Sequence, residues 1–299
     1  MRLPPLLSPG ARVALVAPAG PLRGAEELDA SIANARSLGW DPRPGANVLA
    51  RHEYLGGTDA ERLRDLNTAL ADDDVDAVWC VRGGYGALRL LPHVDWASLT
   101  RRPRALIGFS DVTALHAAAS TRCELITYHG PTARVSLTDF SRTSLVRAVV
   151  EGRDPCGRAD AARTVRPGRA SGRLVGGNLA LLTSLAGTPY APDYRGAILV
   201  LEDVGEPAYR IDRMLTQLRL SGALAQIAGL VVGHFTDTAP GHDLSATALD
   251  TLIGEAADVA GVPAVAGVPV GHIDEQWTIP LGATAQLDAD TLTLAVALS

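Results

Sequence analysis

One serine stands where an apolar run meets a helical pattern. The stretch ALIGFSDVTALHAAAS, residues 105–120, leads into Gly-Phe-Ser110-Asp111, and a periodic apolar segment follows at once. A strand-to-helix turn exposes the serine hydroxyl and points the backbone N–H of the next residue, Asp111, the same way. The G-x-S-x-G pattern is incomplete because Val112 stands where the second glycine should be. Ser110 is a candidate nucleophile, although this stretch alone favours a helix N-cap.

A glycine-rich segment, Arg82-Gly83-Gly84-Tyr85-Gly86, follows another apolar run. Glycine lets a backbone approach a ligand closely, so this loop could offer a second N–H donor to an oxyanion. A tight turn without a ligand is an equally good interpretation of the spacing. The segment is no dinucleotide fingerprint, because an arginine occupies the position of the third glycine. Cys80, just before it, is expected to be a small core residue rather than a thiol nucleophile.

A serine nucleophile needs a base and an acid that orients the base. The apolar stretch of residues 196–201 ends in Glu202 and Asp203, and strand ends of this kind are where sites collect. His272, in VPVGHIDEQWTIPLG, opens a polar loop after a short apolar strand, whereas His116 lies inside a helical pattern and is expected to be structural. A turn-capping role for either carboxylate stays open.

Composition narrows the class of protein. The 299 residues carry a formal net charge of −6 with mixed signs, so we expect no nucleic-acid partner. The N-terminus lacks a signal peptide, and no apolar run is long enough for a membrane span, which predicts a cytoplasmic protein without a membrane partner. Three cysteines without a CxxC pair favour reduced thiols. The histidine spacing matches no metal motif, so we expect no metal and no cofactor.

The pattern of elements changes near the middle of the chain. Residues 1–150 alternate short apolar runs with helical segments, which predicts an α/β domain with a parallel sheet, and the spacing of Thr58 and Glu61 predicts a capping box. Residues 151–172 are rich in Gly, Pro, Arg and Asp and are expected to form a linker. Residues 173–299 supply several strands, with one long helix near residues 207–220, and predict a strand-rich C-terminal domain.

Six segments in the same order give the chain a resemblance to the serine LD-carboxypeptidase family. This family includes the murein tetrapeptide carboxypeptidases and the microcin-C immunity peptidases. The resemblance extends from about residue 12 to the C-terminus. The segments are VRGGYGALRLLPHVDW, LIGFSDVTALH, TYHGP, GRLVGGNLALLTSLAGTPY, ILVLEDVGEPAYRIDRML and VGHIDEQWTIPLG.

The resemblance implies a Ser-Glu-His triad formed by Ser110, Glu202 and His272. It also implies that the backbone N–H groups of Asp111 and Gly84 receive the oxyanion. The implied fold has two parts, an N-terminal α/β domain with the serine and a C-terminal, partly barrel-like α/β lobe with Glu202 and His272. The active site would lie in the cleft between them, and members of the family are commonly homodimers.

The leaving group of an LD-carboxypeptidase is a D-amino acid with a free carboxylate, so a cationic side chain is expected near the site. Each candidate arginine could instead serve in an ordinary ion pair. The candidates for this contact are Arg82, Arg173 and Arg210. Further candidate substrate-binding residues are Gly83, Tyr85 and Trp277.

The resemblance implies one of two substrates. The murein branch releases D-alanine from the muropeptide L-Ala-D-Glu-meso-diaminopimelate-D-Ala in peptidoglycan recycling, whereas the microcin branch cleaves peptidyl or aminoacyl nucleotides and stacks the base on aromatic side chains. Between residues 131 and 171 only Phe140 is aromatic, which favours the muropeptide. A catalytically silent muropeptide-binding protein and an amidase that uses Cys80 are alternatives.

Overall fold

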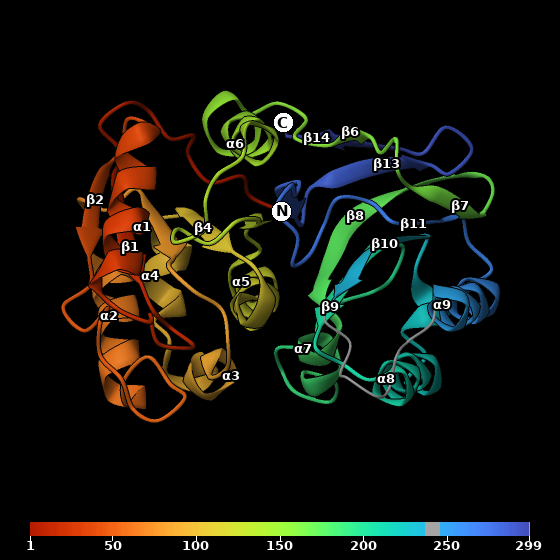
Figure 1. Cartoon of the computed structure of the whole chain (residues 1–299), viewed down its shortest axis with the longest axis horizontal. Helices are drawn as coiled ribbons and strands as arrows, with labels where there is room; N and C mark the ends of the chain where they lie inside the picture. Colours follow the sequence, from red (N-terminus) through yellow and green to blue (C-terminus); the bar gives the residue numbers. More distant parts are fainter. Residues whose placement is uncertain (237–245, 299) are drawn as a thin grey trace.

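The computed structural model describes residues 1–236 and 246–298, so His242 lies outside the described residues. Two β-sheets, each flanked by helices, lie side by side (Figure 1). Both ends of the chain lie between the two sheets in this view. The expected α/β fold with a parallel N-terminal sheet and a curled, partly barrel-like second sheet is confirmed.

The first sheet is six-stranded with the order β12-β5-β4-β3-β1-β2. Its first five strands in sequence are parallel, and β12, from the C-terminal half, pairs antiparallel with β5 at the edge. In doubly wound sheets, sites form outside the carboxyl ends of the strands. The strands are β1 (Arg12–Val16), β2 (Asp41–Pro44), β3 (Ala77–Cys80), β4 (Ala105–Gly108), β5 (Thr127–His129) and β12 (Ile279–Leu281).

Helices cover both faces of this sheet, with separate apolar clusters on each face. The predicted capping box is confirmed, because Thr58 accepts from the Glu61 N–H while the Glu61 carboxylate accepts from the Thr58 N–H. The helices of this half are α1 (Ala25–Ser37), α2 (Asp59–Ala71), α3 (Ala87–Leu90), α4 (Trp96–Arg101), α5 (Thr113–Cys123) and α6 (Asp139–Val146). Shorter helical turns are η1 (Leu91–His93), η2 (Ser110–Val112) and η3 (Arg147–Glu151).

The second sheet is eight-stranded with the order β6-β14-β13-β8-β9-β10-β11-β7. Strands β8 to β11 are parallel, and the outer strands join antiparallel. The strands are β6 (Gly157–Arg158), β7 (Arg163–Arg166), β8 (Arg169–Asn178), β9 (Ile198–Val204), β10 (Gly229–Thr236), β11 (Ala264–Ala266), β13 (Thr284–Asp288) and β14 (Thr293–Ala297).

Side chains alternate along β9 between the two faces of this sheet. Ile198 and Val200 pack with the strands inside the curl, whereas Leu199 and Leu201 pack under the helices outside it, as the period of two in a strand requires. The helices on the outer face are α7 (Leu179–Ser184), α8 (Ala208–Leu220), η4 (Leu224–Gln226) and α9 (Ala246–Ala260). The expected long helix near residues 207–220 is α8.

The linker expected over residues 151–172 carries structure of its own, so that expectation was wrong. It contains β6, β7 and the start of β8, which are strands of the second sheet. Strands β6 and β7 are short and lie at the two sheet edges, so they lack the apolar periodicity that marks a buried strand. The division into domains over residues 1–150 and 173–299 stays a prediction, because β12 also ties the C-terminal half to the first sheet.

Candidate active site

Ser110 lies at the carboxyl end of β4, in a tight turn that opens α5. Its φ is +66°, a left-handed conformation that costs a non-glycine residue roughly 1–2 kcal/mol. The helix-cap interpretation is wrong, because the Ser110 side chain makes no capping hydrogen bond. Strain of this kind persists where surrounding structure holds it, and it is typical of nucleophile turns in hydrolases.

Gly83 packs directly against the serine. A Cβ atom at position 83 would lie 2.8 Å from Ser110 Cβ and 3.0 Å from Ser110 Oγ, so only glycine fits without displacing the hydroxyl. The next residue, Gly84, has a φ of +108°. Gly20 N–H donates to the Gly83 carbonyl at 2.9 Å and fixes this loop to the segment after β1. The structure therefore brings Ser110, Gly83 and Gly84 together at the carboxyl ends of β3 and β4.

Two backbone N–H groups beside the serine are unused. Among residues 1–236 and 246–298, neither the Asp111 N–H nor the Gly84 N–H has a hydrogen-bond partner. The Asp111 side chain is buried and accepts from the Ala87 N–H at 2.7 Å, which ties the turn to the start of α3. Burial raises the pKa of this carboxyl to about 6. Free donors next to a nucleophile are what an oxyanion hole requires.

The second half of the chain supplies an acid bonded to a base. His272 Nδ1 lies 2.8 Å from Glu202 Oε2, and the Glu202 side chain is fully buried at the end of β9. Gly271, with a φ of +119°, allows this contact, because a Cβ there would lie 3.2 Å from Glu202 Oε2. A buried carboxylate holds an imidazole in one orientation and stabilises its protonated form. The pair is built as the acid and base of a triad would be.

Phe109 links the two halves of the site. Its ring lies 4.7 Å from the His272 ring, measured between centroids, and Phe109 precedes Ser110 in the chain. The Ser110 hydroxyl has no hydrogen-bond partner among the residues described, and serine–histidine bonds in free enzymes commonly tighten only with substrate. Behind Phe109 lies His129, whose pKa is held well below its usual value by burial and by the nearby His116.

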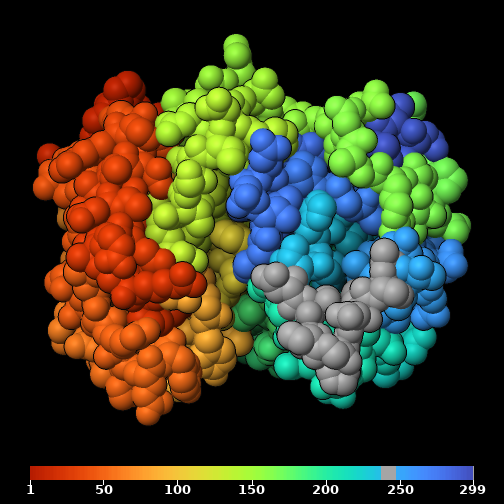
Figure 2. Space-filling model, in the orientation of Figure 1, coloured from red at the N-terminus to blue at the C-terminus, as the bar shows by residue number. Residues whose placement is uncertain are grey.

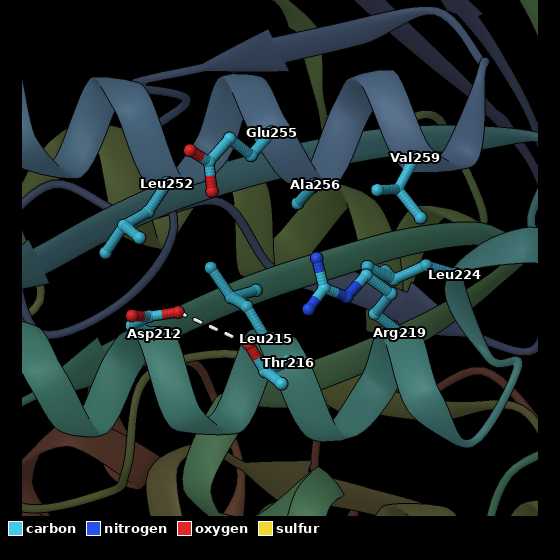
Figure 3. Close-up of a pocket in the computed structure, with 9 residues that line it drawn as sticks. All are labelled: Asp212, Leu215, Thr216, Arg219, Leu224, Leu252, Glu255, Ala256 and Val259. Carbon is cyan, nitrogen blue, oxygen red and sulfur yellow. Dashed lines mark hydrogen bonds between the residues drawn. The ribbon is translucent and has the colours of Figure 1, made fainter.

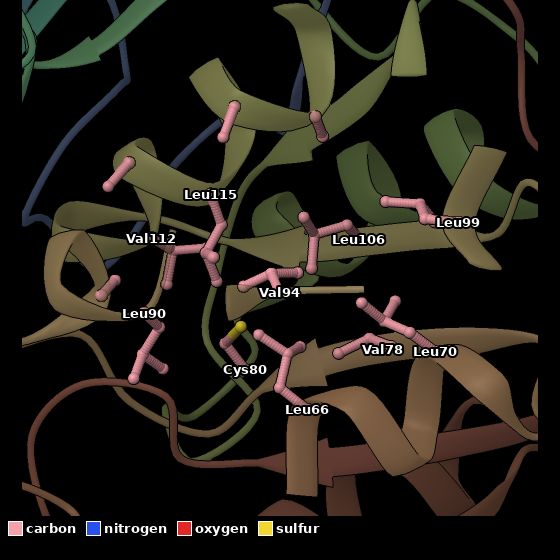
Figure 4. Packing of buried hydrophobic residues seen from close by; sticks show 14 of the residues in the cluster. Leu66, Leu70, Val78, Cys80, Leu90, Val94, Leu99, Leu106, Val112 and Leu115 are labelled. Atoms are coloured by element: carbon pink, nitrogen blue, oxygen red, sulfur yellow. The ribbon is translucent and has the colours of Figure 1, made fainter. Parts of the chain in front are cut away.

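Asp203 and Cys80 serve the fold rather than the candidate site. Asp203 accepts from Asn178 Nδ2 and from the N–H groups of Ala180 and Val204, all within 2.9 Å, so it anchors the start of α7. Cys80 is packed among apolar side chains next to Val112 (Figure 4), and burial raises the pKa of its thiol to about 12. A thiol so shielded from water stays protonated, which rules it out as the nucleophile of an amidase.

The three candidate arginines differ in their partners. Arg173 pairs with Asp193 at 3.7 Å, and Arg210 pairs with Glu206 at 2.9 Å. Arg82 donates to the Pro21 carbonyl but has no carboxylate partner among the described residues. Burial, together with nearby Arg134, lowers the pKa of Arg82. Since its neighbour Gly83 touches Ser110, Arg82 is the candidate that combines an unpaired charge with a position beside the nucleophile.

The two aromatic candidates lie in different environments. Tyr85 is half exposed beside the glycine loop and packs edge-on against Tyr54, with ring centroids 5.6 Å apart. Trp277 is only 3% exposed and packs inside the second sheet, so it presents no surface to a substrate. The sequence alone could not separate these two rings, because both lie in short segments without a clear apolar periodicity.

Sequence reasoning missed Arg134, which lines a cavity of about 240 Å³ together with His272 and Phe109. In Figure 2 the yellow-green residues around α6 meet the blue C-terminal residues, and Ser141 Oγ donates to the Asp274 carbonyl at this junction. No pattern marked Arg134, because only the fold brings it to the loop of His272.

A second depression lies between α8 and α9, and Figure 3 shows Asp212, Arg219 and Glu255 at its edges. None of the triad candidates lines it. Among the residues that the structure describes, no group of three or more His, Cys, Asp or Glu side chains could hold a metal ion. Nor does any helix in that part of the chain combine the length and apolar character that a bilayer span needs.

A strained serine, unused N–H donors and a buried Glu–His pair are the features that a serine hydrolase site requires. Residues 13–130 match the LD-carboxypeptidase N-terminal domain, and residues 171–287 match the LD-carboxypeptidase C-terminal domain. The chain belongs to the LD-carboxypeptidase family and is a serine-type carboxypeptidase. The resemblance seen in the sequence is thereby confirmed.

Individual relatives agree with this assignment. The chain is 38% identical to a murein tetrapeptide carboxypeptidase of Pseudomonas aeruginosa, over 94% of each protein. It is similar to the crystal structure of a muramoyltetrapeptide carboxypeptidase from Oxalobacter formigenes, with a TM-score of 0.82, 29% identity and coverage of 96% of this chain and 98% of that one. An MccF-like protein from Bacillus anthracis has the same fold, with a TM-score of 0.91 over 100% of both chains at 21% identity.

Proposed function

We propose that this protein releases the terminal D-alanine from the murein tetrapeptide L-Ala-D-Glu-meso-diaminopimelate-D-Ala. Ser110 is the nucleophile, His272 the general base and Glu202 the residue that orients His272. The observation that carries the proposal is the 2.8 Å contact between His272 Nδ1 and the buried Glu202, with the His272 ring 4.7 Å from Phe109, the residue that precedes a serine in a strained turn. The names of the relatives from Pseudomonas and Oxalobacter support the choice of substrate.

The reaction is an acyl transfer in two steps. His272 Nε2 takes the proton of Ser110 Oγ as the oxygen attacks the carbonyl carbon of the scissile amide, and the N–H groups of Asp111 and Gly84 bind the oxyanion. His272 then gives this proton to the leaving amine, and D-alanine departs from an acyl-serine. Water, activated by the same imidazole, hydrolyses the ester and restores the Ser110 hydroxyl.

Arg82 is our proposed contact for the carboxylate of the departing D-alanine. Its guanidinium lies next to the glycine loop and lacks a carboxylate partner among the described residues, whereas Arg173 and Arg210 are already paired. A charge-assisted hydrogen bond would hold the terminal carboxylate and exclude longer peptides. Tyr85, half exposed in the same glycine-rich segment, is a second proposed contact for this end of the substrate.

The proposal also includes a cytoplasmic location and a homodimeric state. A muropeptide substrate in recycling is met inside the cell, which fits the reduced cysteines expected from the sequence. Light scattering coupled to size exclusion tests the dimer, for which twice the chain mass of 31.2 kDa is expected.

The decisive experiment measures D-alanine release from purified murein tetrapeptide. We expect release by the wild type and a loss of at least about a thousandfold in kcat for Ser110→Ala. Ser120→Ala is the matched control, because this serine lies at the far end of the same α5 and should leave kcat within about twofold. Circular dichroism confirms the fold of each variant.

A folded wild type that releases no D-alanine would overturn the murein proposal. An aminoacyl sulfamoyl nucleotide and a peptidyl nucleotide are then tested as substrates, since the microcin branch acts on nucleotides. Tight binding of the tetrapeptide without turnover would instead indicate a silent muropeptide-binding protein.

A further inference from the structure

A pocket of about 240 Å³ opens beside the catalytic pair, and we call it the His272 pocket. His272 and Phe109, the residue that precedes Ser110, line this pocket, and the chain segments after β5 and after His272 supply the rest of its lining. Its charged and amide-bearing lining residues are Arg134, Asp274 and Gln276. A pocket that touches both the base and the neighbour of the nucleophile lies where a substrate side chain next to the scissile bond would enter.

The Arg134 guanidinium has N–H groups that are not used in hydrogen bonds within the described residues. Nη1 donates to Glu27 Oε1 at 3.0 Å, whereas Nε is buried without a partner among the described residues. A guanidinium carries five N–H donors in a planar fork that matches a carboxylate. Arg134 can therefore bind an anionic group of the substrate while it keeps the bond to Glu27.

The charge around Arg134 also favours an anion. Glu27 is shared by two arginines, because Arg23 lies 3.9 Å from the same carboxylate, and Arg82 lies near this group without a carboxylate of its own. One carboxylate thus faces three guanidinium groups. A bound carboxylate would offset part of this excess positive charge.

The same pocket also contains hydrogen-bond acceptors that could bind a cation. The Asp274 carboxylate has no ion-pair or hydrogen-bond partner among the described residues. Gln276 is only 3% exposed, and its Oε1 is a buried acceptor that lacks a partner in the part of the chain described. Both groups accept hydrogen bonds, so they suit an ammonium group. A pocket with an arginine fork and two such acceptors fits a zwitterion.

We propose that the His272 pocket binds the free amino-acid end of the diaminopimelyl residue, with its carboxylate on Arg134 and its ammonium group on Asp274 and Gln276. This inference rests on the proposed function, and it assigns the third residue of the peptide as the one that the enzyme selects. The size agrees, because a cavity of about 240 Å³ has room for the roughly eight heavy atoms of the diaminopimelate side chain. The methyl group of D-alanine needs far less room.

The experiment compares three tetrapeptides that differ only in the third residue: meso-diaminopimelate, the same residue with its free carboxyl amidated, and L-lysine, which lacks that carboxyl. Wild-type kcat/KM should be about 10- to 100-fold higher for diaminopimelate than for the other two, as expected for a charge-assisted hydrogen bond. Arg134→Ala should lower kcat/KM for diaminopimelate by that factor and bring the three values together. Asp274→Asn should reduce turnover of all three by a few-fold, because each keeps the ammonium group.

Arg23→Ala is the matched control. Arg23 shares Glu27 with Arg134 but does not line the pocket, so its loss should leave the preference for diaminopimelate unchanged. Equal wild-type kcat/KM for the three peptides would overturn the subsite and leave the carboxypeptidase function standing, even if Arg134→Ala failed to fold. An equal loss for all three peptides in Arg134→Ala would also overturn it, because Arg134 would then act on a group common to them. If a folded wild type cleaves none of them, the proposed function fails and the subsite falls with it.

Discussion

The two halves of the candidate site are held by different means. On the serine side the backbone does the positioning: Ser110 has a φ of +66°, Gly83 leaves room for its hydroxyl, and the donors are main-chain N–H groups. On the acid–base side a side-chain hydrogen bond does the positioning, because a fully buried Glu202 orients His272.

This difference sets how each half should respond to substitution. The serine side is sensitive to added volume, because one extra methyl group would meet Ser110 itself. The acid–base side is sensitive to the loss of a charge, because Glu202 meets His272 away from water, where electrostatic interactions are strong. Variants on each side can therefore test whether backbone and side-chain positioning are separate.

The largest effect is expected on the acid–base side. Glu202→Gln removes the charge that stabilises the His272 imidazolium and can leave the ring in the wrong tautomer, so kcat should fall by about 10³–10⁴. Steady-state kinetics of D-alanine release measure this. Glu206→Gln, just beyond the same strand, is the control and should stay within about twofold, because Glu206 pairs with Arg210. A loss below tenfold in Glu202→Gln would show that the carboxylate is not part of the triad.

On the serine side, Gly83→Ala tests the backbone. The new Cβ would lie 2.8 Å from Ser110 Cβ, so the hydroxyl must shift, and a shift of about 1 Å costs on the order of 10² in rate. Gly254→Ala, at a helical position of α9 with open space around it, is the control and should leave kcat unchanged. Unaltered kcat in a folded Gly83→Ala would mean that the loop can move aside, which would break the contrast between the two halves.

The triad of Ser110, Glu202 and His272 stays a prediction that rests on the family resemblance. From its alternating apolar runs, the sequence itself predicted the parallel sheet. It could not decide between nucleophile and helix cap at Ser110, since both place a serine at a helix start; the left-handed φ and the missing capping bond separate them. The sequence did not reveal β6 and β7, because edge strands of two to four residues bury too few side chains to leave an apolar pattern. The sequence did not identify Arg134 as a site residue, because Arg134 and His272 line the same pocket but are distant in sequence.

A smaller effect is expected from Asp111, whose carboxyl ties the serine turn to α3. Burial raises its folded-state pKa to about 6 from a usual value of 3.8, so the folded protein binds the proton more tightly than the unfolded chain. Wild-type stability should therefore fall as the pH rises from about 4 to 6, through the unfolded and then the folded pKa. Asp111→Asn has no such proton, so it should gain about 1–3 kcal/mol relative to the wild type between pH 4 and 7.

Urea unfolding at several pH values measures this difference. Asp76→Asn, at a half-buried aspartate paired with Arg102, is the control for the loss of a carboxylate away from the serine turn. A constant stability difference between wild type and Asp111→Asn across this range would show that the carboxyl titrates alike in both states.

The smallest effect concerns the strain at Ser110 itself. Ser110→Ala and Ser110→Gly both lack the nucleophile, but only glycine adopts a φ of +66° without the steric cost of a Cβ. Part of that gain is offset by the greater chain entropy of glycine, so Ser110→Gly should be more stable than Ser110→Ala by about 0.5–1 kcal/mol, a rise of about 1–3 °C in Tm. Calorimetry on the two inactive variants isolates the cost of the left-handed conformation, because both variants lack the serine hydroxyl. Equal Tm values would mean that the turn relaxes around alanine, and the serine side would then be held by packing against Gly83 rather than by its backbone conformation.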